Sequence, residues 1–503
     1  MFVGREAELD FLETKYHAKG RQLIAFYGRR HIGKTETLKR FCADKPHFFF
    51  SCRECSNNMQ LRSFSKTLRQ ACASGLLDGA SFDGSHHYFQ NQMPDEGFTS
   101  WENALYGMLH LPFGTSRKLI ILDEFPYIYK DNPRIISTLQ KFWDTLHRDY
   151  NIMLVLCGST MNFFEKKILR HSSPLFDRLT GVFKMDNLSF FDAVKFFPNY
   201  SDQDKIIAYA VFGGSPHHLL QIDPSLSLAD NIKQNILSKG CALYNEVDFL
   251  LRQELRETLH YNTLLETIAR GSGRISEISR DSLIDETSKT GAYLYNLLEL
   301  EVVKREPTLV IGSELKGSAK RSLYRHTDYF FHFWYAFAYQ NYAALEEGDA
   351  DKMYDTIVKP HLMEYASKIF PDICRQYLKE LQGSHALPFQ YAQLGQLFGK
   401  TVFKDGASSY SEQANLDILA MSEDKTNFLL GECRFSGNPV SYFEYLALQK
   451  KLIPLRKRAN FYYALFSGFG FEEKLCKIAA QNHNLILYPL EQIVAKKAPD
   501  PTL

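Results

Sequence analysis

The chain has 503 residues, of which 45% are hydrophobic and 23% are charged. This composition is typical of a globular protein with about three or four domains, and it excludes a chain that is disordered over most of its length. The formal net charge of +1 excludes binding of nucleic acid through the overall field, so only local patches could bind it.

No signal peptide is expected, because the first residues lack its basic and apolar segments. No apolar run reaches the length of about 18 residues that spans a bilayer, so we expect a cytoplasmic protein without membrane contact. The nine cysteines, an odd number, favour reduced thiols over disulfides. Cys52 and Cys55 are spaced like half of a metal site, but no matching second half follows, and structural thiols are the preferred interpretation.

Residues 22–38 predict a nucleotide-binding loop between a buried strand and a helix. An apolar run is followed by GRRHIGKT, which matches G-x-x-x-x-G-K-[ST] at every fixed position. Glycines let successive N–H groups point at one phosphate, and the following helix adds a partial positive charge. Lys34 is expected to reach the β- and γ-phosphates of ATP, and Thr35 is expected to bind Mg²⁺. The predicted ATP-binding residues of the loop are Gly28, Arg29, Arg30, His31, Ile32, Gly33, Lys34 and Thr35.

A second strand, at 118–122, runs into two carboxylates. Asp123 at this strand end can hold Mg²⁺ beside Thr35, while Glu124 can activate the water that attacks the γ-phosphate. A further apolar strand, at 152–157, ends near Ser159. A serine there could equally cap the following helix.

The sequence FVGRE at residues 2–6, upstream of the loop, resembles the archaeal-type ATPases within the STAND and AAA+ group of P-loop NTPases. The resemblance implies that Val3 and Arg5 lie near the adenine and that Ser159 is a polar sensor residue. It also implies that Arg178 supplies a positive charge to a nucleotide in the same or a neighbouring subunit. An arginine in a polar loop is equally often only a surface charge.

Beyond the core, the turn GGSP at 213–216 resembles part of the helical lid of this family. Residues 261–330 then read as three helices and a β-wing, a winged helix-turn-helix pattern. Its predicted recognition helix, 289–296, carries little positive charge, whereas DNA binding usually requires several Lys or Arg contacts to phosphate. DNA binding and intramolecular packing therefore both stay open for this module.

Near the C-terminus, two predicted strands at 415–420 and 427–434 form a hairpin that could bring Asp417 and Glu432 together. With Glu364 from a preceding helix they would form a carboxylate cluster for a divalent metal. This pattern resembles the PD-(D/E)XK nuclease superfamily, which implies a nuclease-like domain acting on DNA or RNA.

Arg434 stands where that superfamily has lysine, and a guanidinium cannot give up a proton to activate water. Lys450 and Lys451, on the next helix, are the candidates to replace it. An active nuclease, an inactive nucleic-acid-binding relic and a structural domain are the three alternatives.

We therefore predict an α/β protein. It has a P-loop NTPase core with a parallel sheet over 1–205, a helical lid over 206–260, a winged-helix module over 261–330 and an α/β nuclease-like domain over 331–503. The predicted function is a Mg²⁺-dependent ATPase switch that controls action on a nucleic-acid target. The alternative is a nucleotide-controlled regulatory or scaffolding protein without nuclease activity. The expected partners are ATP, DNA or RNA, a protein partner and further copies of the chain.

Overall fold

The computed structural model describes residues 2–73, 97–111, 113, 116–255, 257–284, 287–309, 322–398, 400–405, 408–413, 415–452 and 459–498, with the backbone alone at 400–405 and 408–413. The chain divides into two units. The first unit holds residues 1–188 and 215–217, and the second holds 189–214 and 218–503. This division assigns residues 189–205, which the sequence placed in the ATPase core, to the second unit.

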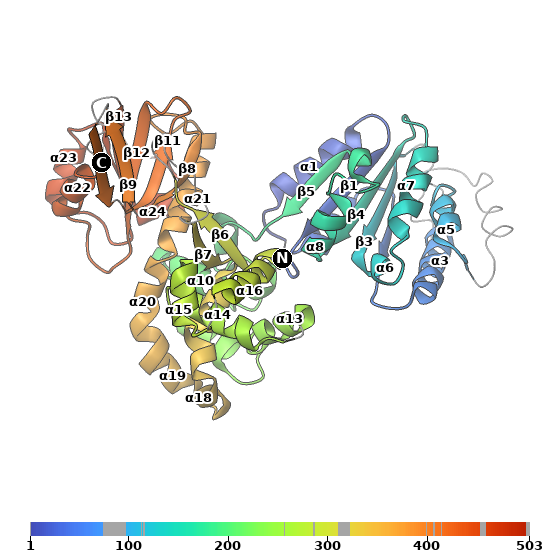
Figure 1. Cartoon of the computed structure of the whole chain (residues 1–503), viewed down its shortest axis with the longest axis horizontal. Coiled ribbons are helices and arrows are strands. Elements are labelled where there is room, and N and C mark those ends of the chain that lie inside the picture. Colours follow the sequence, from blue (N-terminus) through green and yellow to red (C-terminus); the bar gives the residue numbers. More distant parts are fainter. Residues whose placement is uncertain are drawn as a thin grey trace. The chain divides into compact units, whose positions relative to one another are not determined.

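A five-stranded parallel sheet forms the centre of the first unit, in the order β2-β3-β4-β1-β5 (Figure 1). Every residue of β1 and β4 is buried, as expected for a parallel sheet with helices on both faces. The strands are β1 (Gln22–Gly28), β2 (His47–Ser51), β3 (Lys118–Asp123), β4 (Ile152–Gly158) and β5 (Gly181–Met185).

Side chains alternate between the two faces of this sheet. Leu23 and Ala25 of β1 join the hydrophobic cluster with the helices α3, α5 and α7, while Ile24 and Phe26 join the cluster with α1 and α2. The two-residue period of a strand thus builds a core on each face. The helices of this unit are α1 (Glu6–His17), α2 (Lys34–Cys42), α3 (Asn57–Ala73), α5 (Trp101–Met108), α6 (Pro126–Asp131), α7 (Ile135–Thr145) and α8 (Met161–Phe163).

The second unit begins with helices and continues into a three-helix segment and a hairpin. Helices α14 (Leu259–Ala269), α15 (Ile275–Asp281) and α16 (Thr287–Glu299) precede the antiparallel pair β6 (Val303–Pro307) and β7 (Ser322–His326). This is the order of elements that the sequence predicted between 261 and 330. The other helices before the second large sheet are α9 (Phe190–Ala193), α10 (Asp202–Phe212), α11 (Pro216–Leu219), α12 (Leu228–Ile232), α13 (Glu246–Glu254), α17 (Tyr329–Phe333), α18 (Tyr342–Glu346), α19 (Ala350–Met353), α20 (Lys359–Ser367) and α21 (Phe370–Gly383).

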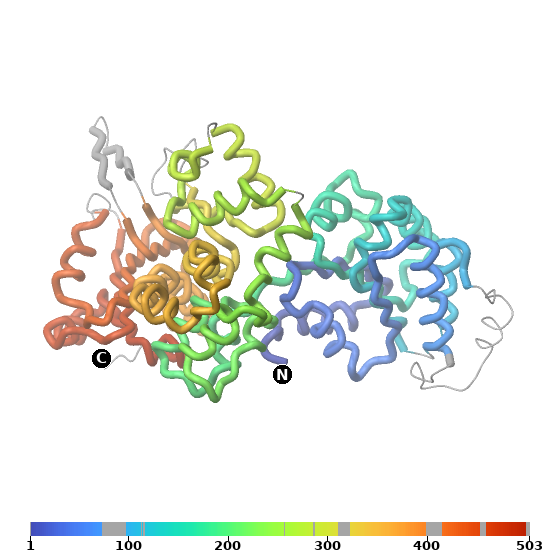
Figure 2. The backbone as a smooth tube through the Cα atoms, turned by 90° about the horizontal axis from the view of Figure 1, so that it is seen from below, coloured from blue at the N-terminus to red at the C-terminus, as the bar shows by residue number. Residues whose placement is uncertain are grey.

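A mixed five-stranded sheet, in the order β14-β13-β12-β11-β8, ends the second unit. Strands β8, β11 and β12 pair antiparallel, whereas β12, β13 and β14 pair parallel. Figure 2 shows the orange and red segments that hold α21 and this sheet lying side by side. Its elements are β8 (Gln393–Leu397), β11 (Leu416–Met421), β12 (Asn427–Arg434), α22 (Tyr442–Gln449), β13 (Asn460–Ser467), α23 (Glu473–Ala479), β14 (Leu485–Pro489) and α24 (Leu490–Val494), and the separate hairpin β9 (Lys400–Asp405) and β10 (Ser408–Gln413) lies between β8 and β11 in the chain.

Short 3₁₀ and π turns connect several helices: η1 (Phe164–Ile168), η2 (Phe176–Arg178), η3 (Val194–Phe196), η4 (Lys233–Leu237), η6 (Trp334–Ala338), η7 (Tyr339–Asn341) and η8 (Tyr354–Val358). Among the described helices, none combines the length and the apolar character needed to cross a membrane. The predicted α/β class, with a parallel P-loop NTPase sheet and a second sheet near the C-terminus, is confirmed.

Candidate functional site

The loop between β1 and α2 has the backbone that a phosphate-binding loop needs. His31 and Gly33 have φ angles of 65° and 91°, in the left-handed region that is free of strain only for glycine. A Cβ atom on Gly28 would lie 2.4 Å from the Met185 carbonyl oxygen. Both glycines of the motif are therefore required by the local backbone.

Lys34 is held inside the loop. Its side chain is buried, and its Nζ donates a hydrogen bond of 2.7 Å to the Arg29 carbonyl oxygen. Burial lowers the pKa of Lys34, and the charges of Glu124 and Asp123 oppose this shift. A desolvated ammonium group beside the loop N–H groups and the start of α2 is suited to bind phosphate.

The two nucleotide motifs meet at Thr35 and Asp123. Thr35 Oγ1 donates a hydrogen bond of 2.7 Å to Asp123 Oδ2. Strands β3, β4 and β1 are neighbours, so their carboxyl ends share one edge of the sheet. A hydroxyl and a carboxylate oxygen are hard ligands of the kind that Mg²⁺ prefers, so these two residues fit the predicted metal.

Glu124 lies at the same edge and is held by Ser159. Its backbone has a φ of 51°, and its Oε2 accepts hydrogen bonds from Ser159 Oγ at 2.9 Å and from the Ser159 N–H at 3.2 Å. The residue that caps the next helix is Thr160, without a side-chain cap bond. The alternative of a capping role for Ser159 is therefore wrong.

The Arg5 side chain contacts the backbone of the phosphate-binding loop. The buried guanidinium donates hydrogen bonds to the carbonyl oxygens of Ile32 at 2.6 Å and Asp186 at 2.7 Å, and it pairs with Glu8 at 2.8 Å. Val3, the other residue predicted near the adenine, is partly buried. Arg5 thus ties the start of α1 and the segment after β5 to the phosphate-binding loop.

Residues 215–217 also contact the loop, and the sequence did not predict this contact. Ser215 Oγ donates a hydrogen bond of 3.1 Å to the His31 carbonyl oxygen, and the His217 ring centroid lies 4.6 Å from that of His31. Pro216 Cγ would be 3.6 Å from a Cβ on Gly33. The GGSP turn was visible in the sequence, but nothing in its spacing paired it with the loop.

Arg178 lies at the opposite edge of the sheet from the loop of its own chain. Its Nε and Nη2 each bond to an Asp144 carboxylate oxygen at 2.7 Å. The nearby Thr180 N–H donates to the Leu23 carbonyl oxygen at the start of β1, whereas the loop follows the end of β1, about 17 Å further along the strand. The structure therefore does not bring Arg178 to the nucleotide site of the same subunit.

The second predicted cluster forms on the C-terminal sheet. Ile418 of β11 faces Gly431 of β12, so Asp417 lies opposite Glu432 on one face of the sheet. Asp417 Oδ2 accepts a hydrogen bond of 2.9 Å from the Cys433 N–H. Burial, together with the charge of Asp417, raises the pKa of the Glu432 carboxyl.

Two cations from the described part of the chain contact Glu432. The Nζ of Lys451, just beyond α22, forms an ion pair with Oε1, and Arg434 Nη2 lies 3.4 Å from Oε2. Arg434 Nε also pairs with Glu444 at 2.6 Å. Of the two lysines that could replace the missing motif lysine, the structure brings Lys451 to the cluster.

The prediction that Glu364 assists this cluster is not supported. Its side chain, on α20, is 68% exposed and pairs with Lys368 at 3.2 Å. The helix packed against β12 and β11 is α21, from which Arg375 Nη1 donates a hydrogen bond of 2.8 Å to the Asp417 carbonyl oxygen and forms an ion pair with Asp372. The apolar spacing of Phe370, Cys374, Tyr377, Leu378 and Leu381, all buried, was the available signal for this helix.

Comparison with known proteins agrees with the geometry of the first unit. Residues 2–222 match a family model described as an ATPase domain predominantly from Archaea, and residues 334–445 match one described as archaeal and bacterial proteins of unknown function. An uncharacterized protein of Methanocaldococcus jannaschii is 28% identical over 495 residues, which are 98% of this chain and 99% of that protein.

Two further matches are more limited. An uncharacterized ATP-binding protein of the same organism is 49% identical over 45 residues, which are 9% of this chain and 76% of that protein. A Walker-type ATPase of Pyrococcus abyssi, at 16% identity and a TM-score of 0.50, covers 66% of this chain and 96% of its own, and it shows a shared fold. The N-terminal part of this chain is therefore an ATPase domain of the P-loop type.

Proposed function

We propose that this chain is a Mg²⁺-dependent ATPase whose nucleotide state controls the action of its C-terminal domain on a nucleic-acid target. The observation that supports hydrolysis is the hydrogen bond between Thr35 and Asp123, because it joins the two metal-ligand residues beside Lys34. Bound Mg²⁺ would neutralise charge on the β- and γ-phosphates.

The residues of the site divide the work. The loop N–H groups and the start of α2 bind the phosphates, and Lys34 exchanges the Arg29 carbonyl oxygen for a phosphate oxygen. Glu124 accepts a proton from the attacking water or orients that water, since its carboxylate lies at the same strand edge. Ser159 positions Glu124 through the hydrogen bond at 2.9 Å.

A change in the bound nucleotide can be transmitted from the loop through two side chains that contact it. Phosphate binding reorients the backbone of residues 29–33, and Arg5 and Ser215 hydrogen-bond to carbonyl oxygens of this segment. Directly after Ser215 the chain enters α11 and continues into the second unit. A shift of the loop is therefore transmitted along the chain through a hydrogen-bonded turn.

The test compares Lys34→Ala with Glu124→Gln. Loss of a charged contact to phosphate should weaken ATP binding about 10- to 100-fold. Loss of the carboxylate should leave binding intact and lower kcat about 100-fold or more. Lys39→Ala, an exposed lysine on the same helix, is the matched control. Labelled nucleotide titration and steady-state turnover measure both effects, and normal turnover by Glu124→Gln would sink its assigned role.

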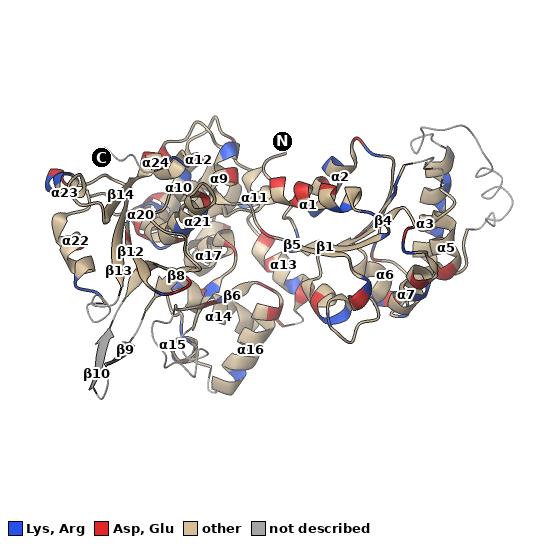
Figure 3. Cartoon of the chain, turned by 90° about the horizontal axis from the view of Figure 1, so that it is seen from above, with Lys and Arg blue, Asp and Glu red and all other residues tan. Residues whose placement is uncertain are grey.

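A basic groove in the first unit supports a nucleic-acid target. Both signs of charge are interspersed along the helices (Figure 3), but the groove beside α3 is lined by Arg53, Arg62, Lys66 and Arg69. Among the described residues that line it, Glu54 is the acidic one. Glu54 forms an ion pair with Lys130. Clustered Lys and Arg side chains release counterions on binding phosphates, so affinity for nucleic acid should fall steeply with salt.

We further propose metal-dependent phosphodiester cleavage at the cluster of Asp417 and Glu432, with Lys451 in place of the motif lysine. The carboxylates fit a divalent cation, and the Lys451 ion pair supports the replacement. Lys451→Met should abolish nicking of a labelled duplex in Mg²⁺ or Mn²⁺, whereas Lys450→Met should not. Identical nicking by the wild-type chain and Lys451→Met would contradict the role of Lys451, and no nicking by the wild type would favour the regulatory alternative without nuclease activity.

A further inference from the structure

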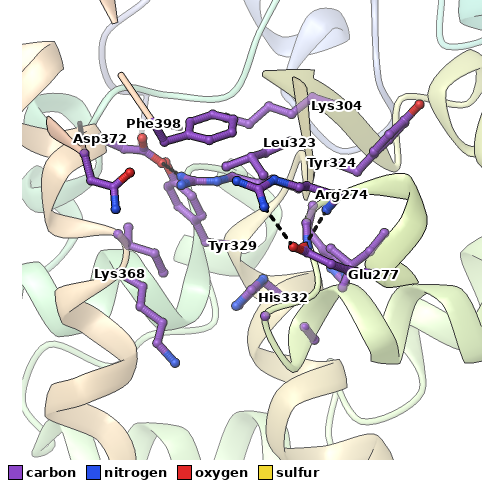
Figure 4. A pocket seen from close by; sticks show the side chains of 18 residues that line it. Arg274, Glu277, Lys304, Leu323, Tyr324, Tyr329, His332, Lys368, Asp372 and Phe398 are labelled. Atoms are coloured by element: carbon purple, nitrogen blue, oxygen red, sulfur yellow. Dashed lines mark hydrogen bonds and ion pairs between the residues drawn. The ribbon is translucent and has the colours of Figure 1, made fainter. Parts of the chain in front are cut away.

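A cavity of about 490 Å³ opens within the second unit. We call it the hairpin cavity, because residues of β6 and β7 line one of its walls. Its side chains come from different elements: Figure 4 shows Arg274 before α15, Lys304 on β6, Lys368 after α20 and Phe398 after β8 around this space.

The ionisable side chains on the β6–β7 hairpin and on the neighbouring helix α21 carry an excess of positive charge. Arg325 pairs with Glu306 at 3.2 Å, and Arg375 pairs with Asp372 and lies 3.7 Å from Glu306. Tyr329 donates a further hydrogen bond of 2.8 Å to Asp372. Gln396 Nε2 also donates a hydrogen bond of 3.0 Å to Glu306, so both carboxylates are engaged by neighbouring donors.

Lys304 is the third cation of this group, and it lines the cavity. Within the described part of the chain its ammonium group has no hydrogen bond or ion pair, although Glu306 acts on it through space. Burial lowers the pKa of Lys304. A partly buried cation without a paired anion is costly, so a bound anion in the cavity would be stabilised.

The size and the walls of the cavity indicate more than a simple ion. Small-molecule sites have volumes of about 300–1,000 Å³, a range that includes this cavity and far exceeds one phosphate group. The Phe398 ring lines the space and lies 5.7 Å from the Arg274 guanidinium carbon. Tyr324 and the partly buried His332 add flat surface, on which a planar ring can stack.

We propose that the hairpin cavity binds a nucleoside monophosphate, with its phosphate against Lys304 and its base on the Phe398 face. This site is separate from the phosphate-binding loop and does not depend on ATP hydrolysis. Asn415 also lines the cavity and lies two residues before Asp417. A ligand here would therefore join the hairpin to the strand that carries the carboxylate cluster.

Equilibrium dialysis of the full-length chain tests the proposal. A Lys34→Ala background removes high-affinity binding at the loop, and labelled AMP, GMP, CMP and UMP are the probes. At least one should bind at a single site per chain, with the matching nucleoside and inorganic phosphate each about tenfold weaker or worse. Absence of saturable binding by all four monophosphates at millimolar concentration would overturn the proposal.

Substitutions locate the binding. Lys304→Met should weaken the best monophosphate about tenfold, and Lys304→Arg should retain most of the affinity. Lys379→Met, an exposed lysine on α21, should change nothing. Phe398→Leu should reduce the preference for the nucleotide over inorganic phosphate, and this readout stands even if Lys304→Met does not fold. Binding that is equal in all variants, or a 5′-phosphorylated oligonucleotide that binds where no monophosphate does, would contradict a small-ligand site.

Discussion

The phosphate-binding loop and the C-terminal carboxylate cluster both bring a lysine to acidic residues, but they reach this arrangement differently. Lys34 is fixed by a contiguous loop whose backbone itself binds the ligand, so its sequence position cannot change. Lys451 arrives from the end of a helix and meets Glu432 on a neighbouring strand. Where side chains alone build a site, a functional group can move in the sequence and still reach the same place.

The largest effect is expected for the carboxylates that bind metal at the C-terminal cluster. Asp417→Ala should remove Mn²⁺ binding at the cluster, because two facing carboxylates supply its charged oxygen ligands. Glu364→Ala should leave Mn²⁺ binding unchanged, because Glu364 is exposed and pairs with Lys368. Mn²⁺ dialysis without nucleotide measures both variants. A loss of Mn²⁺ binding in Glu364→Ala would mean that Glu364 does contribute to the cluster, as the sequence predicted.

The arrangement of the residues in the first site could be predicted from the sequence because it depends on short-range features of the chain. The spacing from Gly28 to Thr35 dictates one backbone path, and a strand that ends at Asp123 must place it at the same sheet edge. Strand hairpins are similarly local, so the facing of Asp417 and Glu432 could be predicted from their distance to the turn.

The remaining contacts depended on packing between distant segments. Glu364 and Asp372 both lie on helices before the second sheet, and only the buried face of α21 decides which helix packs on it. The position of Arg178 follows from the register of β5 against β1, which no motif encodes. Likewise, the contact of Ser215 with His31 joins residues 184 positions apart in the chain.

The second unit should be sensitive to acid through His326. Burial lowers the pKa of this histidine to about 4, compared with about 6.5 in an unfolded chain. Between these values the unfolded chain binds a proton that the folded unit does not. The free energy of unfolding should therefore fall by about 3 kcal/mol as the pH drops from 6.5 to 4, with no loss from this residue above pH 6.5.

His326→Gln, which can still donate to the Leu265 carbonyl oxygen that His326 Nε2 contacts at 2.9 Å, should flatten this pH dependence. Urea unfolding can be followed through Trp334 of the second unit after Trp101 and Trp143 of the first are replaced by Phe. An unchanged pH profile in His326→Gln would show that the folded unit takes up the proton without cost.

A smaller effect is expected at Ser159, which is a positioning residue for the first site. Ser159→Ala removes the hydroxyl that Glu124 accepts from but keeps the backbone N–H contact at 3.2 Å. Loss of one charge-assisted hydrogen bond should lower kcat about tenfold and leave KM for ATP unchanged. Ser159→Thr, which retains the hydroxyl, should recover most of the turnover. A raised KM with normal kcat would place Ser159 on the nucleotide instead of on Glu124.

The smallest effect is expected at Arg178, because its position sets it apart from the phosphate-binding loop of its own chain. Its ion pair with Asp144 is partly exposed, and such pairs contribute about 0.2–1 kcal/mol. In a dilute monomer, Arg178→Ala should therefore change neither stability nor turnover noticeably.

If the arginine acts on a neighbouring subunit, wild-type turnover per chain should rise with protein concentration, and that of Arg178→Ala should not. Mixing Arg178→Ala with Lys34→Ala would then recover activity, since one variant supplies the nucleotide site and the other supplies the arginine. A loss of turnover in Arg178→Ala that is equal at every concentration would instead mean that the side chain reaches the loop of its own chain, against its position near the start of β1.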